Sequence, residues 1–200
     1  MKLILWIVIG YIIGSIPWGL IIGKVFFHKD IRNYGSGNLG GTNAGRVLGK
    51  SIGIIVIVLD ALKAFIVMCF ANIYAKETLS YVGLAVCIGH CFPIFAGFRG
   101  GKAVASSYGY LLGLYLFVTK DPFTFIIPVA IFFIVLSISK MVSLSSMIGL
   151  SFATLYLFTK DIKFGILMLL LTLFVIYRHK ANIQRIIQGT ESKIGSKKAS

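Results

Sequence analysis

The chain has 200 residues, of which 58% are hydrophobic and only 13% are charged, and its mean hydropathy is +0.92. Soluble globular domains use apolar residues for nearer half of the sequence, so this composition excludes an ordinary soluble domain. The apolar residues form long blocks without the alternation of half-buried strands. The sequence therefore predicts an all-α, polytopic helical membrane protein.

The net charge of +14 would also fit a nucleic-acid-binding protein. However, the basic residues lie in short loops and in the C-terminal tail, where they set membrane orientation and meet anionic lipids or substrates. We therefore expect the lipid bilayer, and no nucleic acid, as a partner. Cys87, His90 and Cys91 offer three potential ligands without a second cluster, so we expect no metal.

Seven apolar segments are predicted to span the membrane, although several are shorter than about 18 residues, so that five spans is the alternative. They are residues 3–25, 51–74, 79–95, 103–118, 122–138, 147–158 and 162–177. The sequence GSIPWG interrupts the first segment, where proline is expected to kink the helix. We expect one membrane domain, residues 1–190, followed by a basic, disordered tail, residues 191–200.

Two ionisable residues, Asp60 and Lys63, lie inside the second apolar segment. At positions i and i+3 they share one face of a helix, so they can pair with each other. Charged groups at this depth are costly and usually face the protein interior or a site. A structural ion pair and support of a functional site are both open readings.

A glycine-rich polar loop, DIRNYGSGNLGGTNAGRVLG, follows the first apolar segment at residues 30–49. Glycines allow positive φ and a close approach of the backbone to a ligand. Hydrogen-bonding side chains and a permanent cation accompany them, namely Ser36, Asn38, Thr42, Asn43 and Arg46. Such a loop can bind phosphate through backbone N–H groups and an arginine fork. A flexible linker at the membrane surface is the alternative.

A second polar segment, GHCFPIFAGFRGGKAVA, occupies residues 89–105. Gly100 and Gly101 precede Lys102, and a new helix is predicted to begin near Ala103. Orphan N–H groups, the helix dipole and a cation together favour an anion. The spacing is not that of a Walker A loop, so nucleotide hydrolysis is not indicated. His90 is expected to orient the loop more than to react.

Two further polar segments lie nearer the C-terminus. A hydroxyl-rich connection, residues 139–146, contains Ser143 and Ser145. In residues 178–191, His179, Asn182 and Arg185 follow helical i, i+3, i+6 spacing and so lie along one face. His179 is a candidate general base because its pKa is ordinarily close to neutral. A histidine that merely holds the loop is the alternative.

The basic residues distribute unequally between the two sides of the predicted membrane. One side holds fourteen: Lys24, Lys29, Arg32, Arg46, Lys50, Arg99, Lys102, Lys140, Arg178, Lys180, Arg185, Lys193, Lys197 and Lys198. The other side holds five: Lys2, Lys76, Lys120, Lys160 and Lys163. The positive-inside rule places the fourteen in the cytoplasm and the N-terminus outside. All four polar segments then share the cytoplasmic face, which favours a single phosphate site.

GSIPWG and these four segments, one of which contains VSLSS, resemble the bacterial membrane-integral acyl-phosphate:glycerol-3-phosphate acyltransferases (PlsY-type), in order and over nearly the whole chain. The resemblance implies a seven-span helical fold. It implies transfer of a fatty acyl group from acyl phosphate to the sn-1 hydroxyl of glycerol 3-phosphate, giving lysophosphatidic acid and inorganic phosphate. No cofactor or metal is implied. A soluble enzyme that forms acyl phosphate is a candidate partner.

The resemblance also implies roles for individual residues. Ser36 and Arg46 match the serine and arginine of the first family motif that activity needs. Lys102, at the end of the glycine-rich second motif, would be a phosphate cation. His179 and Asn182 match catalytic residues of the third motif, whose acidic residue of structural importance matches Glu191.

A transporter of a phosphorylated metabolite or anion is the competing class. It would also need cations and broken helices, but with a site near the membrane midplane and gates on both sides. Here the polar residues gather on one predicted face and the turns on the other are minimal. A basic structural anchor for a peripheral partner would leave the glycines unexplained.

Overall fold

The computed structural model describes residues 1–195, which are helical with no strand among them. The contacts divide the chain into two compact units, Met1–Lys120 and the residues from Asp121 onward, and each unit is described by itself. The prediction of an all-helical protein is confirmed for the described residues. The expectation of one domain over residues 1–190 stays a prediction.

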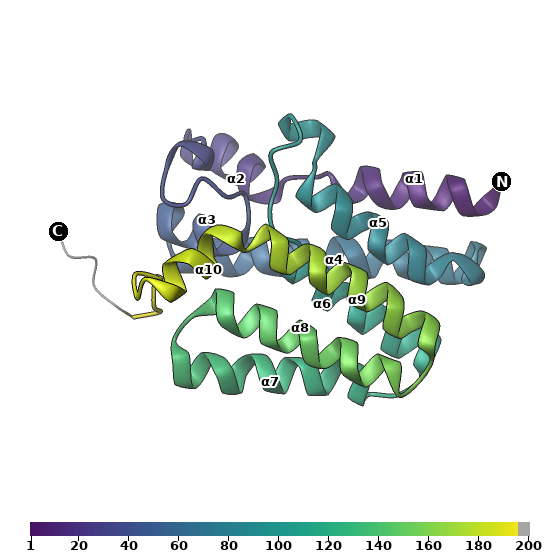
Figure 1. Cartoon of the computed structure of the whole chain (residues 1–200). Coiled ribbons are helices and arrows are strands. Elements are labelled where there is room, and N and C mark those ends of the chain that lie inside the picture. The colour runs from purple at the N-terminus through teal and green to yellow at the C-terminus, as the bar shows by residue number, and fades with distance from the viewer. Residues whose placement is uncertain (196–200) are drawn as a thin grey trace. The chain divides into compact units, whose positions relative to one another are not determined.

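The first unit contains six α-helices, and short helical turns lie in three of the connections between them (Figure 1). They are α1 (Lys2–Gly14), α2 (Trp18–Phe27), α3 (Gly41–Leu48), α4 (Lys50–Tyr74), α5 (Leu79–Cys91) and α6 (Val104–Gly113). The turns are η1 (Ile31–Asn33), η2 (Lys76–Thr78) and η3 (Ile94–Ala96), and a π-helical segment, η4 (Leu114–Thr119), continues α6.

The helix break predicted at GSIPWG is present, because α1 ends at Gly14 and α2 begins after Pro17. Small residues bring α1 against α5, which run side by side (Figure 1). A Cβ atom on Gly14 would lie 2.3 Å from the carbonyl oxygen of Val86. A Cβ on Gly89 would lie 2.2 Å from the carbonyl oxygen of Tyr11. Glycine is therefore needed on both helices for their backbones to touch.

Glycines also seat the short helix α3 on α4. A Cβ on Gly53 of α4 would lie 2.6 Å from the Cα of Gly45, whereas a Cβ on Gly45 would meet the Cα of Gly53 at an ordinary 3.5 Å. A small apolar core anchors the polar loop beside this contact, formed by Leu20, Ile31, Leu39, Ala44, Val56 and Ala96. The loop of residues 30–49 is thus a packed part of the fold.

One face of α4 presents apolar side chains to the surroundings. The exposed residues recur about one helical turn apart and include Ile54, Val58, Leu62, Ile66 and Phe70. Asp60 and Lys63, in contrast, are buried on the same helix. Exposed apolar side chains and buried charged ones are the arrangement expected of a helix that faces lipid.

The second unit contains α7 (Phe123–Ser139), α8 (Val142–Phe158), α9 (Ile162–Arg178) and α10 (Lys180–Ile187). Helix α8 packs against α7 on one side and α9 on the other (Figure 1). The hydroxyls of Thr154 and Thr172, 2.9 Å apart, join α8 to α9. The axes of α9 and α10 differ by 61° at His179.

The predicted start of the sixth segment at residue 147 is wrong, because α8 already begins at Val142. Three serines of the predicted connection, Ser143, Ser145 and Ser146, lie in the first turns of α8. Ser145 and Ser146 donate their hydroxyls to the carbonyls of Met141 and Val142, four residues earlier. This hydrogen bond gives the hydroxyl an acceptor inside an apolar helix, so a serine-rich sequence here does not indicate a loop.

Among the described residues, three helical segments are long and apolar enough to cross a membrane: Lys2–Phe27, Lys50–Tyr74 and Lys76–Ala96. The bent pair Ile162–Arg178 and Lys180–Ile187 qualifies when taken together. Val104–Thr119, Phe123–Ser139 and Val142–Phe158 are apolar but shorter. These correspond to the seven apolar segments of the sequence, and how many of them cross the membrane stays a prediction.

The chain after α10 remains in contact with the second unit as far as it is described. Glu191 is buried, and the backbone N–H of Ile194 donates to the carbonyl of Lys140 over 2.8 Å. Residues 191–195, assigned by the sequence to a disordered tail, therefore include defined contacts. Residues 196–200 of that predicted tail lie outside the described part of the chain.

Candidate active site

A buried asparagine organises the glycine-rich loop of the first unit. The Oδ1 atom of Asn43 accepts from the N–H of Ser36 over 2.8 Å. Its Nδ2 group donates to the carbonyls of Ile31 at 3.0 Å and Tyr34 at 3.2 Å. The oxygen and the nitrogen of the amide both bond to backbone groups of the loop, so Asn43 stabilises the conformation of this segment. From the sequence alone this role could not be distinguished from contact with a ligand.

The start of the loop is fixed by an ion pair between Asp30 and Arg32. The guanidinium donates from Nε over 2.9 Å and from a terminal nitrogen over 2.6 Å to the carboxylate. These hydrogen bonds from Arg32 hold the pKa of Asp30 at about 2, well below its usual range. Lys24 lies 3.7 Å from the same carboxylate. Arg32 is therefore engaged in the fold of the loop.

The exposed part of this loop carries the residues predicted to bind phosphate. Ser36 stands between Gly35 (φ 63°) and Gly37 (φ 68°), two left-handed residues that turn the chain sharply. Thr42 and Arg46 lie one helical turn apart on α3, and both are exposed. A hydroxyl and a guanidinium are thus presented together from the same short helix.

The second polar segment meets the first. The side chain of Asn38 accepts from the N–H of Gly40 over 2.9 Å and approaches the carbonyl of Gly100 at 3.5 Å. Lys102 follows two residues later and is half-buried. Ala103, with φ 59°, closes the loop, and α6 begins at Val104 as predicted. The structure therefore brings both glycine-rich segments of the first unit together.

His90 belongs to a buried cluster with the two charged residues of α4. The Nζ atom of Lys63 lies 2.8 Å from Oδ1 of Asp60 and 2.9 Å from Nδ1 of His90. Nδ1 of His90 is 3.3 Å from the same carboxylate oxygen. Sequence reasoning paired Asp60 with Lys63 but missed the histidine, because it lies on another helix.

In the second unit, the carboxylate of Glu191 accepts hydrogen bonds from three predicted site residues. Its Oε1 atom accepts from the Ser143 hydroxyl over 2.7 Å and from Nδ2 of Asn182 over 2.6 Å. Its Oε2 atom accepts from Nε of Arg185 over 2.8 Å. Burial by itself raises the pKa of Glu191, but the hydrogen bonds from these three groups outweigh it, so the pKa lies below the ordinary value.

The depressed pKa of Glu191 predicts a stability difference that acid removes. A carboxyl with a lowered folded pKa stabilises the fold above its ordinary value, here 4.5, and this contribution is lost as the pH falls through the folded pKa. We expect Glu191→Gln to lower the unfolding temperature at pH 7, and the gap from wild type to narrow below pH 4.5. Thermal unfolding in detergent from pH 7 to pH 3 measures it. Glu77→Gln, at an exposed carboxylate, is the control, and a gap that widens in acid would contradict the assignment.

His179 stands at the joint between α9 and α10 and is buried. Its Nδ1 atom lies 2.8 Å from the carbonyl oxygen of Val175. Because a carbonyl can only accept, Nδ1 carries a proton, and the Nε2 atom of the neutral ring is then an acceptor. That tautomer suits a histidine that receives a proton from a hydroxyl.

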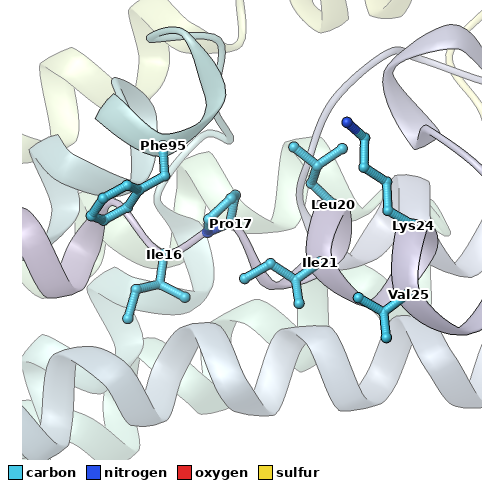
Figure 2. Close-up of a pocket in the computed structure, with 7 residues that line it drawn as sticks. All are labelled: Ile16, Pro17, Leu20, Ile21, Lys24, Val25 and Phe95. Atoms are coloured by element: carbon cyan, nitrogen blue, oxygen red, sulfur yellow. The ribbon is translucent and has the colours of Figure 1, made fainter.

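An open apolar pocket of about 360 Å³ lies beside the helix break of the first unit (Figure 2). Ile16 and Pro17 come from the break, Ile21 and Val25 from α2, and Phe95 from the turn after α5. Leu20 and Lys24 complete the lining. The lining is therefore apolar except for one cationic side chain, and such a pocket suits an acyl chain that carries an anionic group.

Comparison with known proteins decides the family. Residues 4–189 match the family model described as glycerol-3-phosphate acyltransferase. A glycerol-3-phosphate acyltransferase of Macrococcus caseolyticus is 47% identical over 99% of this chain and 100% of its own length. One from Bacillus velezensis is 48% identical over 97% of this chain and 98% of its own. The chain belongs to the glycerol-3-phosphate acyltransferase family.

A solved structure agrees with this assignment. The crystal structure of PlsY (YgiH), an integral membrane glycerol 3-phosphate acyltransferase, in its glycerol 3-phosphate form superposes with a TM-score of 0.88. It is 32% identical and covers 98% of this chain and 96% of its own. The lysophosphatidic acid form of PlsY gives a TM-score of 0.85 at 30% identity. The resemblance found in the sequence, and the integral membrane, multi-pass class, are thereby confirmed.

Proposed function

We propose that this acyltransferase moves a fatty acyl group from acyl phosphate to the sn-1 hydroxyl of glycerol 3-phosphate. The hydroxyl oxygen attacks the acyl carbon, the bond from that carbon to the phosphate oxygen breaks, and lysophosphatidic acid and inorganic phosphate leave. Membership of the family over residues 4–189 is the observation that carries this proposal. The crystal forms of the similar PlsY, with glycerol 3-phosphate and with lysophosphatidic acid, support the acceptor and the product.

We assign phosphate binding to polar groups of the two glycine-rich segments in the first unit. The guanidinium of Arg46 supplies a bidentate fork and Lys102 a point charge. The hydroxyls of Ser36 and Thr42, the amide of Asn38 and the backbone of Gly100 and Gly101 supply further hydrogen bonds. What supports this is the contact between the two glycine-rich segments, with Asn38 reaching toward Gly100. Loss of a single stabilising donor typically costs a factor of about 100 to 1,000 in turnover.

We assign orientation of the attacking hydroxyl to the second unit. His179, as the Nδ1–H tautomer, presents Nε2 as a base or orienter, and a phosphate oxygen of acyl phosphate is the other candidate proton acceptor. Glu191 accepts hydrogen bonds from Asn182 and Arg185 and so fixes both side chains, which supports a role for them in orienting the substrate. The hydroxyl of Ser143 donates to Glu191, so we assign Ser143 to holding this carboxylate. The hydroxyl of Ser145 donates to its own helix at Met141, and its role in substrate binding stays a prediction.

We propose that the apolar pocket beside Pro17 receives the acyl chain, with Lys24 near the charged end. The fourteen basic residues on one predicted side support an active site that faces the cytoplasm. Glycerol 3-phosphate and a soluble enzyme that forms acyl phosphate would reach it from that side.

An assay that separates acyl donors tests the proposed function. Purified protein in detergent, given glycerol 3-phosphate and acyl phosphate, is expected to form lysophosphatidic acid and one inorganic phosphate per acyl group transferred. Acyl-CoA in place of acyl phosphate is expected to give no product. Acyl phosphate without glycerol 3-phosphate measures spontaneous hydrolysis. Product from acyl-CoA at a comparable rate, or none from acyl phosphate, would refute the proposed donor.

A further inference from the structure

Three ionisable residues form a buried triad in the first unit: Asp60 and Lys63 of α4 and His90 of α5. Their relative exposures are 2%, 5% and 7%, so water does not compensate their polar groups. A buried ion pair is weak evidence for a stabilising role, because desolvation offsets most of the attraction. The position of the triad in the fold points to another purpose.

On one side the triad fastens the break between α1 and α2. The Nζ atom of Lys63 donates to the carbonyl of Ile16 over 3.0 Å, in the stretch that no helix covers. An ammonium has three donors, and Asp60, His90 and Ile16 supply three acceptors. Nδ1 of His90 lies within 3.3 Å of both the Lys63 ammonium and the Asp60 carboxylate, so the two residues of α4 together hold the ring.

On the other side the triad carries the glycine loop. The carbonyl of His90 accepts from the N–H of Gly101 over 3.0 Å. A Cβ on Gly101 would lie 1.9 Å from Nε2 of His90, and one on Gly100 would lie 2.2 Å from its carbonyl oxygen. The backbone just before Lys102 therefore rests directly on His90.

We propose that Asp60 and Lys63 are positioning residues, which fix His90 so that the Gly100–Lys102 loop keeps the form that binds the phosphate of glycerol 3-phosphate. Neither residue touches the substrate in this proposal. It rests on the proposed function of that loop. The alternative, an ion pair that only stabilises the fold, makes a different prediction for substrate affinity.

The test replaces the pair by apolar residues of similar size, Asp60→Leu with Lys63→Met, a change that buried ion pairs often tolerate without loss of stability. We expect the thermal unfolding temperature to fall moderately, because the carbonyl of Ile16 and the ring of His90 lose the Lys63 donor. We expect the Kd for glycerol 3-phosphate, measured by calorimetry in detergent, and its KM to rise about tenfold, with kcat at saturation within about threefold. Asp121→Asn with Lys160→Met, which removes a 2.6 Å ion pair elsewhere, is the matched control and should leave both constants unchanged. A folded double variant with wild-type affinity, or a control with the same loss, would overturn the proposal.

A double-mutant cycle between Gly101 and His90 tests the same proposal if the Asp60→Leu, Lys63→Met variant does not fold. Gly101→Ala should weaken glycerol 3-phosphate binding about tenfold, because the His90 ring, held by Asp60 and Lys63, cannot move aside. In a His90→Ala background the same change should cost less than about threefold, since the obstructing ring is gone. Effects that simply multiply would overturn the proposal. Binding of glycerol 3-phosphate is measured without an acyl donor. If the wild-type protein binds glycerol 3-phosphate but transfers no acyl group, the proposed reaction is refuted and the positioning role of Asp60 and Lys63 is not.

Discussion

Replacing Arg46 or Lys102 with alanine is expected to lower kcat/KM by at least about 100-fold, the range found when one stabilising donor is lost. Arg46 is exposed on α3, and Lys102 follows the glycine pair that contacts the loop of α3. Neither change removes a buried apolar side chain, so unfolding temperatures should stay near wild type. Phosphate release from acyl phosphate in the presence of glycerol 3-phosphate measures the loss.

The controls for this experiment come from the same region. Lys50→Ala removes another exposed cation that begins α4, close in sequence to Arg46, and should leave activity within about threefold because long-range charges are screened. Arg46→Lys should recover little, since an ammonium cannot reproduce the planar fork. Near-wild-type rates for Arg46→Ala or Lys102→Ala would remove that residue from the proposed site.

Two glycines on facing helices should respond in opposite ways to the same added methyl group. Gly53→Ala places a Cβ 2.6 Å from the Cα of Gly45 and 2.8 Å from the carbonyl of Gly41, so α3 has to shift on α4. Overpacking of this kind costs about 1–3 kcal/mol. Gly45→Ala meets only an ordinary contact at 3.5 Å and gains helix propensity. Thermal unfolding of both variants gives the comparison, and equal destabilisation would show that the close contact is not at Gly53.

The parts of the fold that the sequence predicted correctly depend on local signals. Pro17 and its small neighbours indicated the break after α1, and the glycine pair before Lys102 indicated the start of α6. Such signals act through the backbone of the residues that carry them. The start of α8 was placed too late because hydroxyls usually indicate a loop, whereas here Ser145 and Ser146 bond back to their own helix.

The parts that sequence reasoning missed depend on contacts between distant residues. The helical periodicity of the sequence does not predict that His90 contacts Asp60 and Lys63, which lie on another helix. The buried charges alone indicated that a partner was needed. Likewise, Glu191 matched a structural position of the family, but only the fold shows that it holds Ser143, Asn182 and Arg185.

The left-handed backbone of Ala103 bears on the proposed binding of phosphate by the neighbouring Lys102. A residue with a Cβ at φ 59° raises the free energy of the chain by about 1–2 kcal/mol relative to glycine. A glycine there would relieve this strain but would surround Lys102 with freely rotating bonds on both sides. Alanine narrows the range of backbone directions open to the ammonium before any anion arrives. In the proposed binding of phosphate by Lys102, less conformational entropy is then lost when the anion binds, so the strain at Ala103 in the free protein favours a higher affinity.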